Sequence, residues 1–60
     1  MKVETIADLE KFLAVQEQAL GAESPEVAAT LIKLANLHLG TNLDKAEALY
    51  RRAHFILEKT

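Results

Sequence analysis

The sequence predicts an all-α fold of three antiparallel helices, at about residues 3–20, 25–39 and 43–59. The only glycines and the only proline, Gly21, Pro25 and Gly40, divide the chain at two places. The segments between these breaks are rich in Ala, Leu, Glu, Lys and Gln, which favour helices. Their apolar residues recur at intervals of three and four, as on one face of a helix. Because the links are short, each helix must fold back on the one before it, within a single domain spanning residues 1–60.

The first predicted helix has one apolar face. Its apolar stripe is interrupted once by a glutamine and consists of Ile6, Leu9, Leu13, Gln16 and Leu20, with Phe12 and Ala19 beside it. A single face of this kind is typical of a helix that packs on one neighbour.

The second predicted helix has two adjacent apolar stripes, so we expect it to be covered on more than one side and to lie in the centre. The stripes are Val27, Leu31, Leu34 and His38, and then Ala28, Ile32, Ala35 and Leu39. Ser24 before Pro25 predicts an N-cap followed by proline at the first helical position. Gly40 stands where a left-handed C-terminal cap is expected.

The third predicted helix again has a single apolar face. Its members are Leu43, Ala46, Leu49, Tyr50, Ala53, Ile56 and Leu57. Thr41 or Asn42 is expected to cap its start. Charged residues cover the rest of the helix, and Glu47 and Arg51 have the spacing of a weak helical ion pair.

Several residues of the second and third predicted helices resemble the tetratricopeptide repeat pattern, which places small and aromatic residues at fixed spacings. They are Leu34, Ala35, His38, Ala46, Tyr50 and Ala53. Residues 17–28 and 46–53 are similar to the longer, roughly 42-residue repeat of kinesin light chains. The resemblance implies one and a half repeats, in which residues 25–59 form a full helix-turn-helix repeat. The first helix is then a half repeat or a cap.

The same resemblance places four residues of the second helix on the concave, ligand-facing side of the repeat: Ala29, Ile32, Asn36 and Leu39. Apolar side chains on that side need covering, and neighbouring repeats normally provide the cover. We therefore expect Ile32, Leu39 and Leu37 to form an exposed apolar patch in an isolated unit.

The sequence contains no residue pattern typical of a catalytic, metal-binding or cofactor-binding site. The chain has no cysteine, and its two histidines, His38 and His54, lack the spacing of metal ligands. Packing is the expected role of His38, with His54 on the surface. Both glycines are isolated, which excludes a glycine-rich phosphate loop. We expect no enzyme, no cofactor and no metal site.

Nucleic acid and membrane are also poor candidates for a partner. The net charge is −2, and the basic residues around Arg51 and Arg52 are interspersed with acids. No apolar run approaches the roughly 20 residues needed to span a bilayer. We expect a cytoplasmic protein.

Two functions follow from the resemblance. The first is a non-catalytic interaction module or scaffold that binds another protein or peptide through the concave side of the second helix, or self-associates there, with a dimer favoured among homo-oligomers. The alternative is a structural fragment, natural or designed, that continues a longer solenoid. Neither the partner nor the pathway can be read from the residues.

Overall fold

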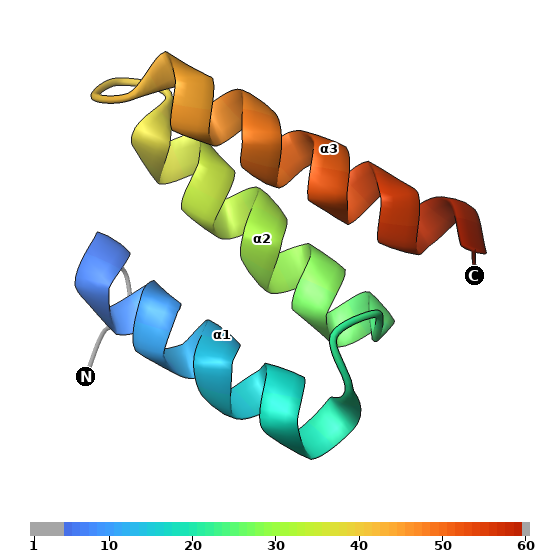
Figure 1. The fold of residues 1–60 in the computed structure, drawn as a ribbon. Helices are drawn as coiled ribbons and strands as arrows, with labels where there is room; N and C mark the ends of the chain where they lie inside the picture. The colour runs from blue at the N-terminus through green and yellow to red at the C-terminus, as the bar shows by residue number, and fades with distance from the viewer. Residues whose placement is uncertain (1–4, 60) are drawn as a thin grey trace.

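A computed structural model of the protein describes residues 5–59 and confirms the all-α fold. It contains three helices, α1 (Ile6–Leu20), α2 (Pro25–His38) and α3 (Leu43–Lys59) (Figure 1). The described part of the chain has no strand. The first residues of the helix expected at 3–20 lie outside the described residues. The helix expected at 25–39 ends one residue earlier, because Leu39 is its C-cap.

At the start of each helix, a side-chain oxygen accepts a hydrogen bond from a main-chain N–H group. Thr5 Oγ1 accepts from the Asp8 main-chain N–H at 3.1 Å and starts α1. Ser24 precedes Pro25 as the N-cap of α2, as expected. At the start of α3, Asn42 Oδ1 accepts from the Lys45 N–H at 3.1 Å, so Asn42 is the cap. These contacts satisfy main-chain donors that have no partner inside the helix.

The two glycines differ in backbone conformation. Gly21 follows α1 with a φ of 95°, and its N–H donates to the Glu17 carbonyl at 3.0 Å. Gly40, expected in the left-handed conformation, does not adopt a positive φ, so that prediction is wrong. Instead, α2 ends in a turn that two main-chain hydrogen bonds close. The His38 carbonyl accepts both of them, from the N–H groups of Thr41 and Asn42 at 2.9 and 2.7 Å.

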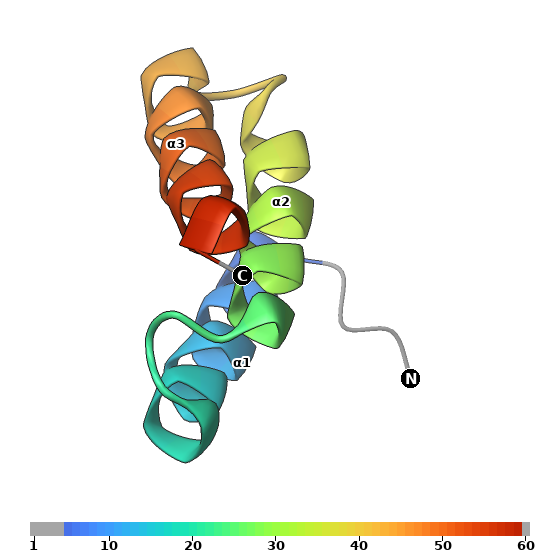
Figure 2. The same ribbon diagram turned by 90° about the vertical axis from the view of Figure 1, so that its right-hand side faces the viewer.

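The α2 helix lies in the centre, as expected. It packs against α1 on one side and α3 on the other, whereas the backbones of α1 and α3 do not meet. Figure 2 shows the three helices from the side, with α2 displaced from the layer of the other two. The Cα atoms extend 29 × 26 × 13 Å, so the molecule is flattened in its shortest direction.

The core lies on the side of α2 that faces both neighbours. Its largest fully buried side chains are Leu31, Leu34, Ile56 and Val27. On α3, the small residues Ala46 and Ala53 are fully buried against α2, which allows the two helices to pack closely.

Long polar side chains connect elements that are distant in sequence. Arg52 of α3 forms an ion pair with Glu17 of α1. Lys59 Nζ lies 3.0 Å from Glu23 Oε1, in the link between α1 and α2. The pair of Arg52 and Glu17 is partly exposed and the pair of Lys59 and Glu23 is exposed, so each contributes little to stability.

Candidate functional site

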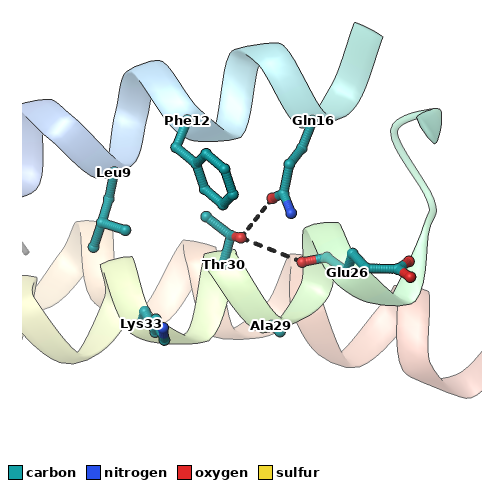
Figure 3. A pocket seen from close by; sticks show the side chains of 7 residues that line it. All are labelled: Leu9, Phe12, Gln16, Glu26, Ala29, Thr30 and Lys33. Carbon is teal, nitrogen blue, oxygen red and sulfur yellow. Dashed lines mark hydrogen bonds between the residues drawn. The ribbon is translucent and has the colours of Figure 1, made fainter. Parts of the chain in front are cut away.

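The best candidate site is a hollow of about 420 Å³ between α1 and α2. Seven side chains line it: Leu9, Phe12 and Gln16 from α1, and Glu26, Ala29, Thr30 and Lys33 from α2. Figure 3 shows the ring of Phe12 directed from α1 toward α2. Phe12 is 47% exposed, so a large part of its ring is available to another molecule.

A buried hydroxyl holds the two walls of the hollow together. Thr30 is 4% exposed, and its hydroxyl donates to Gln16 Oε1 at 2.5 Å. The same oxygen lies 3.3 Å from the main-chain carbonyl of Glu26, one helical turn earlier (Figure 3). The Thr30 hydroxyl and Gln16 Oε1 are therefore paired within the chain, and their hydrogen bond links α1 to α2.

Two residues of opposite charge, Glu26 and Lys33, line the hollow on α2. At the start of the helix, Ser24 Oγ donates to Glu26 Oε1 at 2.5 Å and accepts from the Glu26 N–H at 3.2 Å. The hydrogen bond from Ser24 lowers the pKa of the Glu26 carboxyl, so this group carries a negative charge at neutral pH. Lys33 lies seven residues further along and is exposed.

We define the outer face of α2 as the exposed residues Glu26, Ala29, Lys33 and Asn36. The residues of this face are exposed, and three of them, Glu26, Ala29 and Lys33, also line the hollow beside α1. Two of the four residues predicted from the family resemblance, Ala29 and Asn36, belong to it. Asn36 Oδ1 accepts a hydrogen bond from the Tyr50 hydroxyl of α3.

The other two predicted residues, Ile32 and Leu39, differ from each other in exposure. Ile32 is half-buried and packs against the core cluster that includes Ala53 and Ile56, so it is less exposed than expected. Leu39 is 49% exposed, one residue beyond the end of α2. The four residues are spaced three and four apart, so they lie along one side of α2. Leu37 and Leu39 carry the expected apolar exposure near the end of α2, whereas Ile32 is only partly exposed.

The apolar pattern of α1 predicts packing against one neighbour and does not indicate a hollow. Phe12, Gln16 and Lys33 line it, yet none was a candidate binding residue. The signal in the sequence is the position of Phe12 beside the main apolar stripe of its helix, rather than within it. A large side chain in that position lies at the edge of the helix contact and becomes part of a groove.

Large apolar side chains remain exposed over all three helices. They are Phe12, Val15 and Leu20 of α1, Leu37 and Leu39 at the end of α2, and Leu43, Phe55 and Leu57 of α3. Three short helices in such a flat arrangement cannot enclose apolar residues on both broad sides. The exposure thus follows from the architecture.

The histidines are used differently from each other. His38 is 7% exposed, and neither imidazole nitrogen has a hydrogen-bond partner among residues 5–59. It is buried, as a packing residue would be. His54 is exposed, and its Nε2 lies 3.0 Å from Glu58. Within the described residues, no three His, Asp or Glu side chains come together as metal ligands would. None of the three helices, over the described span, is long and apolar enough to cross a membrane.

Comparison with known protein families identifies a repeat family. A family model described as tetratricopeptide repeat matches residues 3–59, almost the whole chain. Searches of curated proteins and of solved structures gave no significant match.

Proposed function

Because the chain belongs to the tetratricopeptide repeat family, we propose that it is a non-catalytic scaffold module that binds a protein partner through the outer face of α2. The partner is a helix or peptide of another protein, or a second copy of the chain. Repeats of this family are generally helical interaction modules rather than enzymes. Helices that bind other helices do so through an apolar groove with polar residues at its edges.

The hollow beside the outer face is the observation that carries this proposal. Its wall contains the half-exposed ring of Phe12 and the small side chain of Ala29, with a carboxylate and an ammonium group at Glu26 and Lys33. This combination of an apolar floor and separated charges is what a helix-binding groove requires. The hydrogen bond between Thr30 and Gln16 joins the two helices that form the groove.

Photo-crosslinking tests the proposal directly. A photoreactive phenylalanine analogue is placed at Ala29 in one variant and at Ala48, which is exposed on α3, in the control. Irradiation in extracts of the source cell is expected to give a discrete adduct from position 29 and none from position 48. Equal labelling from both positions, or no adduct from either one, would contradict a binding surface on α2.

A second candidate function is supported by the apolar side chains that α1 and α3 expose. A unit of a longer solenoid has such residues because the neighbouring repeats cover them. Fusing a consensus repeat directly after α3 should then raise the melting temperature well above that of the isolated chain. The control joins the same repeat through a long Gly-Ser linker, which does not hold it against α3. Equal melting temperatures for the two fusions would count against this function.

We also propose that the repeat belongs to the kinesin-light-chain-like subtype and that the protein is cytoplasmic. The subtype rests on the resemblance of residues 17–28 and 46–53. The location rests on the lack of cysteine, since small proteins of oxidising compartments commonly depend on disulfides. Cell fractionation of the tagged chain tests the location. Recovery in a secreted or membrane fraction would refute it.

A further inference from the structure

The charges on the outer face of α2 are arranged about a small residue. Glu26 and Lys33 are seven residues apart, which corresponds to about 10.5 Å along a helix. Ala29 lies between them, close to the midpoint of the pair. All three residues are exposed. Within residues 5–59, neither Glu26 nor Lys33 takes part in a salt bridge.

This pattern is self-complementary in one orientation. When a second α2 lies antiparallel across Ala29, a two-fold axis places Glu26 opposite the partner's Lys33 and Lys33 opposite the partner's Glu26. A parallel arrangement in register would place like charges together and is disfavoured. The pattern of charges therefore selects an antiparallel pairing, and two-fold symmetric dimers are the commonest homo-oligomers.

The shape of the surface agrees with this pairing. At the crossing point, the methyl side chain of Ala29 lets the two helices approach closely, because the distance between packed helices depends on the side chains at their contact. Phe12 stands beside α2 at the hollow and is 47% exposed. In the pair, each Phe12 ring flanks the partner's helix and loses contact with water.

We propose that the partner bound by the outer face of α2 is a second copy of this chain, in an antiparallel two-fold dimer centred on Ala29. The inference rests on the proposed function, because it names the partner of the same surface. The hydrogen bond between Thr30 and Gln16 positions α1, and with it Phe12, for this contact. Ile32 packs toward α3 and takes no part in it.

Charge reversal tests both the dimer and its register. The molar mass of the wild-type chain is measured across dilution by light scattering and is expected to change from twice 6.6 kDa to 6.6 kDa. The single variants Lys33→Glu and Glu26→Lys should both be monomers, because each places like charges opposite one another. Mixing these two variants should give a heterodimer, and the double variant should again form a homodimer.

Controls separate a lost contact from a lost fold. Lys33 is exposed, so the helical content of Lys33→Glu measured by circular dichroism should stay at the wild-type level. Glu26→Lys also removes the hydrogen bond from Ser24 at the start of α2, so its melting temperature should fall while the chain remains helical. Lys45→Glu makes the same charge change at an exposed position of α3 and should leave the dimer intact. Equal weakening by Lys45→Glu and Lys33→Glu would mean that net charge, rather than register, controls the association, and would overturn the proposal.

Two further results would overturn the dimer, and the crosslinking experiment shows whether the binding surface survives them. The first is a wild-type chain that remains a 6.6 kDa monomer at about 1 mM. The second is a dimer that persists in Lys33→Glu. A foreign adduct from position 29 would then preserve the proposed function without self-association. Failure of both experiments would remove both proposals.

Discussion

The hydroxyl of Thr30 donates to Gln16 Oε1 at 2.5 Å and joins the centre of α2 to α1. Leu9 is the only residue of the described α1 helix that is fully buried, so packing alone holds this helix weakly. A hydrogen bond at a buried position is therefore important for where α1 lies and for the width of the hollow.

Replacing Gln16 with methionine tests this hydrogen bond. The Gln16→Met variant should lose about 0.5–1.5 kcal/mol of unfolding free energy, because the acceptor is gone while the length of the side chain is kept. Thr30 would retain the Glu26 carbonyl as its acceptor, which limits the loss. Urea denaturation measures the change. Gln18→Met, at an exposed position of the same helix, should be close to neutral, and an equal loss in both variants would argue against a specific contact.

Enlarging Ala53 tests the close packing of α2 and α3. Ala53 is 1% exposed, so Ala53→Leu has no space for the added atoms and should cost about 1–3 kcal/mol. Ala48→Leu makes the same change at an exposed position of α3 and should stay within about 0.5 kcal/mol of the wild type. Thermal unfolding compares the two variants. Similar melting temperatures for both would show that the interface can expand.

The two glycines provide a matched pair of backbone substitutions. A Cβ at Gly21 would meet no atom within 4 Å, but the φ of 95° is unfavourable for alanine, so Gly21→Ala should cost about 1–2 kcal/mol. Gly40 has equal space and no positive φ, so Gly40→Ala should be neutral or stabilise by up to about 1 kcal/mol. Urea denaturation is expected to separate the variants in this order. The reverse order would contradict the backbone geometry.

The hydrogen bond between Ser24 and Glu26 predicts a dependence on pH. It lowers the pKa of Glu26 below the ordinary value of 4.5, so the native state binds this proton less readily than the unfolded state does. The resulting stabilisation is present above pH 4.5 and is lost as the pH falls through the lowered pKa. Carboxyl titration by NMR should show the pKa of Glu26 rising toward its ordinary value in Ser24→Ala. An unchanged pKa would contradict the assigned cause.

Most of the fold could be predicted because its signals are local. The apolar spacing within each segment and the Ser-Pro sequence before α2 determine helices and their starts, and both are confirmed. The end of α2 could not be predicted in the same way. A glycine after a helix commonly caps it, but here the main chain turns at the carbonyl of His38 while Gly40 keeps a negative or extended φ.

The site was less predictable because it depends on how α1 and α2 lie relative to each other. Ala29 could be placed on an exposed face from its position in the repeat, and the structure places it at the hollow. That Phe12 and Lys33 line the same hollow depends on the offset between the two helices. No spacing within one helix determines that offset. The exposure expected for Ile32 was too high, because its position at the edge of the α2 and α3 contact allows partial burial.

The central position of α2 has a consequence for the order in which the amide hydrogens exchange with solvent. The backbones of α1 and α3 contact α2 and not each other, so α1 can detach while the pair of α2 and α3 remains folded. Amides of α1 are then expected to exchange through this partial opening. Those in the middle of α2 should exchange only when the whole chain unfolds.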